Sequence, residues 1–278
     1  MSDIVVASGL GSNLRASWRL LAYLGFTLSL IPLQMLLLLL RLPGRYRLPL
    51  WYHGATCFLT GIKVVTRGQR NRKQPTLFVS NHVSYLDISV LGSLVDGHFV
   101  AKSEVGSWPL FGILAKLSGT VFIQRRRHKS NESRISMARR LGDGRDLMLF
   151  PEGTSSDGTR VLPFKSALFS VAQVAEGDRP LMVQPISITY TRLDGMPMGR
   201  LWRPFYAWYG DMGLPGHLWH ALAMGTLTVE VEFLEPIEAS SFTNRKEMAA
   251  HCHRLVSGGV SKALAGSHSR VASSPTKW

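Results

Sequence analysis

Thr76-Leu77-Phe78-Val79-Ser80-Asn81-His82-Val83-Ser84-Tyr85-Leu86-Asp87 is the stretch around which the rest of the chain is organised. Its first five residues form an apolar run that predicts a short buried strand, and the pattern from Tyr85 to Val95 predicts a helix. His82 and Asp87 therefore lie where a buried strand gives way to a helix. An imidazole can accept a proton near neutral pH, and a carboxylate can orient the ring and stabilise its charged form. The two residues form a candidate general-base pair.

This pair requires a bend in the chain between its two members. On one continuous helix, five residues turn through about 500°, so the two side chains would diverge. The objection disappears if His82 lies in the turn and Asp87 lies in the first helical turn. The same stretch also fits a capping box, in which Ser84 is the N-cap and Asp87 lies near the positive end of the helix. The local sequence leaves both interpretations open.

The composition of the chain indicates a membrane partner. The 278 residues carry a net charge of +14, 45% of them are hydrophobic, and the mean hydropathy is +0.07. This length suits one catalytic domain with appendages. Between Asp3 and Asp87 the charged residues are all Lys or Arg, and they accompany the strongest apolar run of the chain. That combination favours an anionic membrane surface over nucleic acid, for which the sequence contains no recognised motif.

The N-terminal part contains this apolar run, Leu20 to Leu40, with arginines on both sides. At about 1.5 Å per residue, one helix of this length can cross a ~30 Å hydrocarbon layer. Pro32 and Gln34 equally allow a helix that bends back within one leaflet, and a buried core helix is the remaining alternative. Leu48 to Gly61 is milder and rich in aromatic residues, as in an interfacial helix. We therefore expect residues 1–60 to form a membrane anchor.

From residue 61 onward, strand patterns alternate with helix patterns. This alternation predicts an α/β domain over residues 61–265, with a central, mostly parallel sheet flanked by helices and with ligands at the carboxyl ends of the strands. Residues 192–225, rich in Gly, Pro and Trp, are expected to be irregular, and residues 266–278 are expected to form a disordered tail. The predicted strands are Ile62–Thr66, Leu77–Ser80, Phe99–Ala101, Thr120–Ile123, Leu147–Phe150, Met182–Tyr190 and Thr226–Phe233, and the predicted helices are Tyr85–Val95, Leu110–Leu117, Glu132–Leu141, Lys165–Ala175 and Arg245–Leu264.

Three further motifs end predicted strands or interrupt them. They are Gly119-Thr120-Val121-Phe122-Ile123-Gln124-Arg125, Phe150-Pro151-Glu152-Gly153-Thr154 and Gln184-Pro185-Ile186. Together with Asn81, His82 and Asp87, which match an N-H-x4-D pattern, they resemble in order the four motifs of the glycerolipid acyltransferase family. The best-known members of that family are 1-acylglycerol-3-phosphate acyltransferases. The resemblance runs from about Gly61 to about Phe233, and four motifs in the correct order make it specific.

The resemblance implies transfer of an acyl group from a thioester, acyl-CoA or acyl carrier protein, to the hydroxyl of a lysolipid in the membrane. No metal or other cofactor is implied, and the two distant cysteines give no metal-binding spacing. His82 would be the general base and Asp87 would orient it. The resemblance also implies an acceptor-binding set, Arg125, Glu152, Gly153, Thr154 and Lys165, and a hydrophobic acyl pocket containing Phe122, Pro185 and Ile186. For Glu152, a surface carboxylate paired with a nearby cation is the alternative interpretation.

One departure from the family pattern bears on the acceptor. Family members that act on lysophosphatidic acid commonly continue the third motif as E-G-T-R-S, whereas this chain has Ser155 at the arginine position and adds Asp157 nearby. The variant resembles a subgroup that includes bacterial lyso-ornithine lipid acyltransferases, and Asp157 could meet the amine of an ornithine head group. An enzyme that acts on lysophosphatidic acid only remains an alternative, because Arg125 and Lys165 could supply positive charge.

Two other classes of function remain as alternatives. A lipid esterase or transacylase would use Ser84 as a nucleophile, although the chain contains no G-x-S-x-G elbow. A non-catalytic lipid-binding protein would keep only the scaffold. The basic residues that follow the apolar run agree with placement of the catalytic domain on the cytoplasmic side of a bacterial inner membrane.

Overall fold

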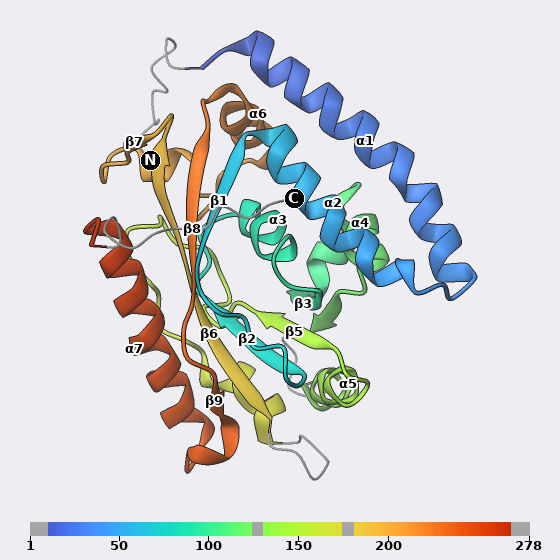
Figure 1. Ribbon diagram of the computed structural model, residues 1–278, viewed down its shortest axis with the longest axis vertical. Helices are drawn as coiled ribbons and strands as arrows, with labels where there is room; N and C mark the ends of the chain where they lie inside the picture. Colours follow the sequence, from blue (N-terminus) through green and yellow to red (C-terminus); the bar gives the residue numbers. More distant parts are fainter. Residues whose placement is uncertain (1–10, 124–129, 174–180, 268–278) are drawn as a thin grey trace.

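The computed structural model describes residues 11–123, 130–173 and 181–267, and in this part of the chain strands and helices alternate as the sequence predicts. Figure 1 shows a central sheet with helices on both of its faces. The strands are β1 (Ile62–Gly68), β2 (Thr76–Ser80), β3 (Gly97–Lys102), β4 (Val121–Ile123), β5 (Asp146–Leu149), β6 (Met182–Leu193), β7 (Met196–Pro197), β8 (Leu227–Phe233) and β9 (Ile237–Glu238). The α-helices are α1 (Asn13–Leu39), α2 (Gly44–Thr60), α3 (Leu86–Gly92), α4 (Phe111–Leu117), α5 (Ser130–Gly142), α6 (Leu214–Ala223) and α7 (Arg245–Leu264), and the short 3-10 helices are η1 (Ser103–Ser107), η3 (Ser166–Gln173), η4 (Arg203–Phe205) and η5 (Ala239–Ser241).

Nine strands of the described residues form one sheet, whose main path runs β1-β8-β6-β2-β5-β3-β4. Neighbouring strands on this path are parallel except β6 and β8, and the short β7 and β9 also pair with β6 in antiparallel fashion. The prediction of a mostly parallel sheet flanked by helices is thus confirmed. Central strands of such sheets are buried on both faces, which explains why all five residues of β2 are buried and its three middle residues are apolar.

Successive side chains of the central strands enter two separate hydrophobic cores. Phe78 of β2 points to the core beneath α2 and α3, whereas its neighbours Leu77 and Val79 point to the core beneath α5 and α7. The same alternation runs along β6, where Val183 belongs to the second core and Ile186 to the first. The even-numbered residues of β6 therefore form the face of this strand that lies toward α3.

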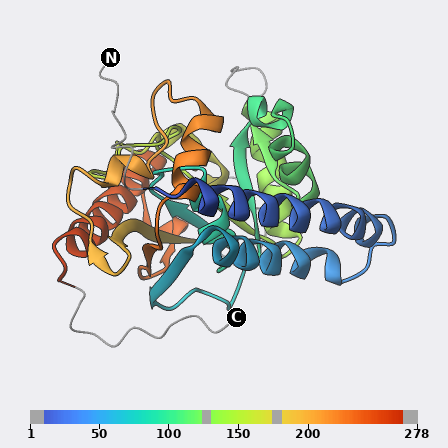
Figure 2. The same cartoon turned by 90° about the horizontal axis from the view of Figure 1, so that it is seen from above.

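Helix α1 lies beside α2 and is held against the body of the protein from Ala16 to Gln34, and its C-terminal end extends beyond the body together with the start of α2 (Figures 1 and 2). Three small or polar side chains hold it there. Ala16 packs against the end of α6, Thr27 hydrogen-bonds to the Tyr52 hydroxyl of α2 at 3.0 Å, and Gln34 donates to backbone carbonyls of Arg45 and Leu117. Pro32 and Gln34 thus lie inside one helix that reaches Leu39. The chain then turns back into α2.

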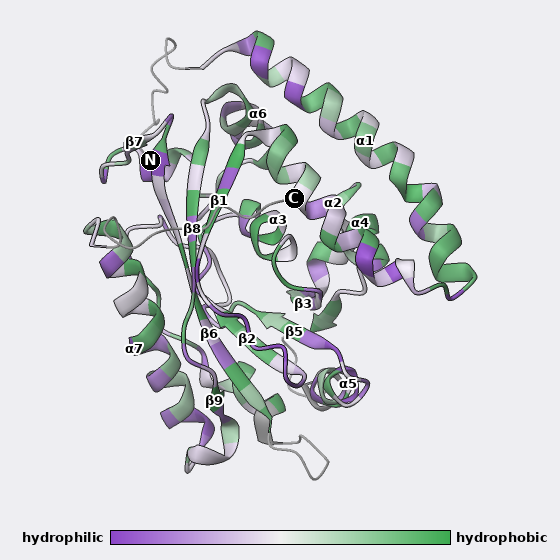
Figure 3. Ribbon diagram, in the orientation of Figure 1, coloured by the Kyte–Doolittle hydropathy of each residue, from purple (hydrophilic) through white to green (hydrophobic). Residues whose placement is uncertain are grey.

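The outer side of α1 is apolar and uncovered (Figure 3). Leu14, Trp18 and Leu39 are 82%, 70% and 78% exposed, and Phe58 of α2 is 78% exposed. Among the described residues, α1 is the one helix long and apolar enough to cross a membrane by length and composition, and 17% of its most apolar stretch is buried inside the protein. A buried core helix is therefore the wrong interpretation of this run.

Three of the predicted helices and strands differ markedly from the structure. The predicted helix Tyr85–Val95 is shorter, spanning Leu86–Gly92, and the predicted helix Lys165–Ala175 is the 3-10 helix η3. Strand β6 continues past Tyr190 to Leu193 because it pairs with β8, with a register shift between Tyr190 and Arg192.

The stretch 192–225 was expected to be irregular, yet it contains helix α6. Pro215 lies at the start of α6, where its fixed φ is compatible with a helix and no backbone donor is required. The end of α6, Ala221 to Ala223, is buried, in part against α1. The predicted tail from residue 266 lies almost entirely outside the described residues.

Candidate active site

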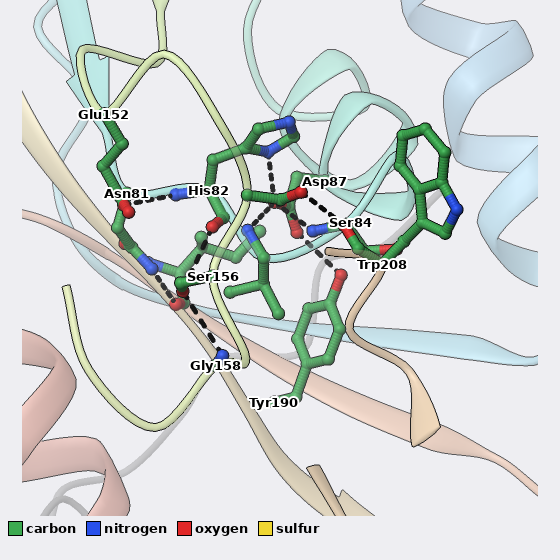
Figure 4. A network of polar contacts seen from close by, with 12 residues as sticks. Asn81, His82, Ser84, Asp87, Glu152, Ser156, Gly158, Tyr190 and Trp208 are labelled. Carbon is green, nitrogen blue, oxygen red and sulfur yellow. Dashed lines mark hydrogen bonds and ion pairs between the residues drawn. The ribbon is translucent and has the colours of Figure 1, made fainter. Parts of the chain in front are cut away.

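His82 and Asp87 meet at the carboxyl end of β2. Residues 81–85 form an irregular turn after β2, and Asp87 lies in the first turn of α3. The bend brings His82 Nδ1 to 2.8 Å from Asp87 Oδ2 (Figure 4). Asp87 is fully buried, whereas the His82 side chain is 20% exposed. Because an ionised carboxylate only accepts hydrogen bonds, Nδ1 is the donor in this contact, and in the neutral ring the lone pair is then on Nε2.

The Asp87 carboxylate receives four donors. Its Oδ2 accepts from His82 Nδ1 and from the backbone N–H groups of Val83 and Ser84, at 2.7 and 3.1 Å, and its Oδ1 accepts from the Tyr190 hydroxyl at 2.7 Å. The bond from the Ser84 N–H is the one that the acid of a capping box makes. Asp87 therefore combines the two interpretations that the sequence left open, although the helix itself starts after Tyr85 rather than after Ser84.

The His82 ring is also held in its plane. It stacks on Phe150, with ring centroids 4.1 Å apart and an interplanar angle of 19°, and Phe150 in turn stacks on Phe99 at 6.2 Å. Phe150 directly follows β5, next to β2 in the sheet. Stacking at this distance restricts rotation of the imidazole, so that its Nε2 keeps one direction.

Glu152 holds the backbone of His82 instead of lining a binding surface. Its Oε1 accepts the His82 N–H at 2.8 Å, its Oε2 accepts the Leu162 N–H at 3.0 Å, and the residue is 1% exposed. Burial raises the pKa of Glu152 to about 8, against the opposing effect of the two backbone hydrogen bonds. The N–H of Ser156 donates to the His82 carbonyl at 2.9 Å, so one loop binds both polar groups of the His82 peptide backbone.

This placement corrects both interpretations of Glu152. The carboxylate is neither a surface group nor part of a wall facing a head group. Its neighbours fit the acceptor-binding prediction better, since Gly153, Thr154 and Lys165 all line the same cavity as His82. Gly153 has a φ of +66°, and a Cβ there would lie 2.8 Å from the Lys165 ammonium nitrogen. Arg125 and the basic residues after it lie outside the described residues.

The cavity has a volume of about 940 Å³, near the upper end of the ~300–1,000 Å³ of ordinary ligand sites. It extends from His82 to the inner sides of α1 and α2, where Leu30 and Leu48 line it. Most of the wall is apolar and much of it is aromatic. The aromatic residues of the wall include Tyr23, Tyr52, Phe99, Trp108, Phe111 and Trp208. Such a cavity suits a long apolar chain whose polar end lies at the imidazole.

The hydrophobic-pocket prediction differs from the structure at its three positions, because none of Phe122, Pro185 and Ile186 is among the described residues that line the cavity. Pro185 pairs with Val79 inside the sheet, and Ile186 is fully buried in the core beneath α3. The Phe122 ring lies near Gly106. The apolar part of the cavity is instead formed largely by α1, α2 and α4, which lie outside the motifs, while His82, Gly153 and Thr154 of the motifs line its polar end.

Trp208 closes one side of the site. Its backbone N–H donates to the Val83 carbonyl at 3.0 Å, and its own carbonyl accepts from the Ser155 hydroxyl. Ser155, which replaces the arginine of the family pattern, thus ties the 203–213 loop to the loop after β5, and the Trp208 N–H ties it to the turn that carries His82. Asp157 does not line the cavity: its Oδ1 accepts from the backbone N–H and hydroxyl of Thr159, at 2.9 and 2.7 Å. Its predicted contact with an amine has no support in this arrangement.

Asp157 also has cations beside it. Burial alone would raise its pKa, but the bonds from Thr159 and the charges of Arg160 and Arg200 outweigh burial and lower the pKa. Within the described residues, no group of three or more His, Cys, Asp or Glu side chains is placed to hold a metal ion.

Comparisons with known proteins agree with this geometry. Residues 61–189 match the family model described as Acyltransferase. A lyso-ornithine lipid O-acyltransferase of Rhizobium meliloti (strain 1021) is 44% identical over 242 residues, which cover 86% of this chain and 82% of that protein. A protein of the same name from Brucella abortus (strain 2308) is 43% identical over 249 residues, which cover 88% of this chain and 93% of that protein.

Two more distant similarities concern glycerophosphate lipids. A 1-acyl-sn-glycerol-3-phosphate acyltransferase of Neisseria gonorrhoeae is 35% identical over 170 residues, covering 61% of this chain and 63% of that protein. The crystal structure of the 1-acyl-sn-glycerophosphate (LPA) acyltransferase PlsC from Thermotoga maritima superimposes with a TM-score of 0.64 at 20% identity, over 89% of this chain and 98% of that one. This last similarity shows a shared fold.

Proposed function

This chain belongs to the acyltransferase family, and we propose that it moves an acyl chain from a thioester to the free hydroxyl of a lyso-ornithine lipid. Two of its relatives, each more than 40% identical over most of its length, carry that name. The observation that carries the proposal at the site is the free Nε2 of His82 at one end of a long apolar cavity.

In the proposed reaction, His82 Nε2 removes the proton from the acceptor hydroxyl while the hydroxyl oxygen attacks the thioester carbonyl carbon. A C–O bond forms, the C–S bond breaks, and the leaving thiolate takes up the proton from the imidazolium. Asp87 stabilises the imidazolium between these steps. A general base of this kind contributes typically ~10²–10⁴-fold to the rate. The donor in this proposal is acyl carrier protein or coenzyme A carrying the acyl chain as a thioester.

The acceptor assignment rests on the head-group side of the cavity. Lys165 and the loop of Gly153 and Thr154 line it, while Ser155 is occupied with Trp208. Fewer described cations are therefore available for a phosphate than the E-G-T-R-S pattern would provide. This supports a zwitterionic ornithine head as the acceptor and makes lysophosphatidic acid the alternative to be tested.

The assay that tests the proposal supplies purified full-length protein with isotope-labelled acyl chains on acyl carrier protein or on coenzyme A, each with a panel of lysolipids. We expect mass spectrometry to detect labelled ornithine lipid. Product from lysophosphatidic acid alone would replace the acceptor assignment, and labelled free fatty acid in place of lipid would favour an esterase. The His82→Ala variant with the same panel controls for contaminating enzymes.

We further propose that α1 and α2 hold the enzyme on the cytoplasmic side of the bacterial inner membrane, while residues from 61 onward form the catalytic domain. Because α1 is docked on the body from Ala16 to Gln34, its exposed side fits a surface layer of one leaflet better than a full crossing. We expect Leu21→Asp combined with Leu28→Asp to move the protein from the membrane to the soluble fraction, and Ile135→Asp on α5 to leave it bound. Cleavage of the catalytic domain by protease added outside intact spheroplasts would contradict the orientation.

A further inference from the structure

We propose that Tyr190 is a positioning residue of the reaction, because its hydroxyl fixes the plane of the Asp87 carboxylate and thereby the direction of the His82 imidazole. The inference rests on the proposed function and adds to it a residue that lies outside the four motifs. Figure 4 shows the Tyr190 hydroxyl pointing at Asp87 from the side opposite His82.

The division of donors between the two carboxylate oxygens is the basis of this inference. His82 Nδ1 and the N–H groups of Val83 and Ser84 all bind Oδ2, whereas Tyr190 binds Oδ1. The χ2 angle of an aspartate is broad, and rotation about the Cβ–Cγ bond moves both oxygens together. The three donors on Oδ2 and the hydroxyl on Oδ1 therefore restrain the same angle from the two sides of the carboxylate. Tyr190 supplies the restraint on the Oδ1 side and so helps to determine how Oδ2 is presented to the imidazole.

The surroundings keep this hydroxyl available as a donor. Tyr190 is 2% exposed and Asp87 is fully buried, so water does not compete for the contact. Burial first, and then the nearby charge of Asp87, raise the pKa of Tyr190 well above its usual range. The phenol accordingly stays protonated and donates whenever the carboxylate is ionised. Without it, the Asp87 Oδ1 would be a buried acceptor lacking its donor.

Asn81 explains why Tyr190 reaches Asp87. The Asn81 side chain donates to the Ile188 carbonyl at 2.9 Å and accepts from the Ile188 N–H at 2.8 Å. This two-way clamp continues the pairing of β2 and β6 beyond Ser80, the last residue of β2 in the register. Tyr190 lies two residues after Ile188, on the same face of β6, which is the face toward α3. The clamp thus sets the position of Tyr190 relative to the turn that carries His82.

Tyr190→Phe in the full chain removes one hydroxyl and keeps the buried ring. A hydrogen bond to a charged group is worth enough that we expect kcat to fall between about 10- and 100-fold. KM for the lysolipid and for the thioester should stay within about twofold, because Tyr190 does not line the cavity. A role in fold stability alone would lower the amount of active enzyme and would leave kcat per folded molecule unchanged.

Tyr206→Phe is the matched control. Tyr206 is 3% exposed, its ring lies edge-on to Tyr190 at 6.5 Å, and its hydroxyl has no hydrogen-bond partner in the described part of the chain. We expect this variant to keep the kcat of the wild type. In a second test, Tyr190→Phe should lower the residual kcat of Asp87→Asn by less than twofold, because residues that act through one another are not additive.

The outcomes separate this inference from the proposed function. An active wild type, an inactive His82→Ala and a Tyr190→Phe variant with kcat within twofold of wild type would overturn the role of Tyr190 alone. A higher KM at unchanged kcat would overturn it as well. If the wild type transfers no acyl chain to any lysolipid, the proposed function fails and the inference fails with it.

Discussion

Replacing His82 with alanine is expected to lower the acyl-transfer rate by about 10²–10⁴-fold, the range that a general base contributes. The variant loses the imidazole, which lines the cavity and has a nitrogen available to accept a proton. KM should change little, because in the proposed reaction the apolar wall binds the acyl chain. The measurement is kcat from labelled product at saturating lysolipid and thioester, with thermal unfolding to confirm the fold.

Ser84→Ala is the variant that separates a general base from a serine nucleophile. Ser84 and Ser80 are both fully buried, so neither hydroxyl is placed to attack a thioester in the cavity. We expect Ser84→Ala to retain transfer within a few-fold of the wild type, because no step of the proposed reaction uses the Ser84 hydroxyl. Loss of activity in Ser84→Ala together with retention in His82→Ala, or a trapped acyl-serine, would discard the direct-attack mechanism.

Asp87→Asn is expected to have the second-largest effect. An amide has the shape of the carboxylate but no charge, so it stabilises the imidazolium poorly. Its NH₂ group also replaces one of the two oxygens and cannot accept the hydrogen bonds made there. We expect kcat to fall by about 10²–10⁴-fold, because the base loses its charged partner. The unfolding free energy should fall by about 1.5–3 kcal/mol, the scale of a hydrogen bond to a charged group.

Kinetics at saturating substrate and urea unfolding measure the two expected losses. Asp143→Asn makes the same chemical change in an exposed turn before β5 and should alter neither quantity. An Asp87→Asn enzyme with wild-type kcat would show that the carboxylate merely caps α3, as the capping-box interpretation alone has it.

The sequence predicts those features that depend on residues close together in the chain. His82 and Asp87 are five residues apart, so the order strand, turn, helix was enough to place them together. The bounds of α7 match their prediction, because Asn244 caps its start by accepting from two backbone N–H groups and an apolar stripe runs along one face. The alternation of apolar strands and amphipathic helices likewise predicted the mostly parallel sheet.

Features that depend on contacts between distant segments were not predictable in this way. Tyr190 is a single polar residue in an apolar strand, and only the register of β6 against β2 brings it to Asp87. Glu152 has the residue type of a binding group, but the backbone N–H groups of His82 and Leu162 surround it. Ile186 is equally compatible with a core and with a pocket, since both are apolar. In each case the deciding neighbour is ten or more residues away.

The clamp between Asn81 and Ile188 spans 107 residues, and this separation matters while the protein is being made. A ribosome delivers the His82 turn long before it delivers β6, and contacts between such distant segments form late. Until β6 joins the sheet, Asp87 lacks the Tyr190 donor on its second oxygen and Asn81 lacks its partner Ile188. Under the proposed mechanism, an unfinished chain that lacks β6 would transfer acyl chains poorly, and full activity would appear only once β6 has joined the sheet.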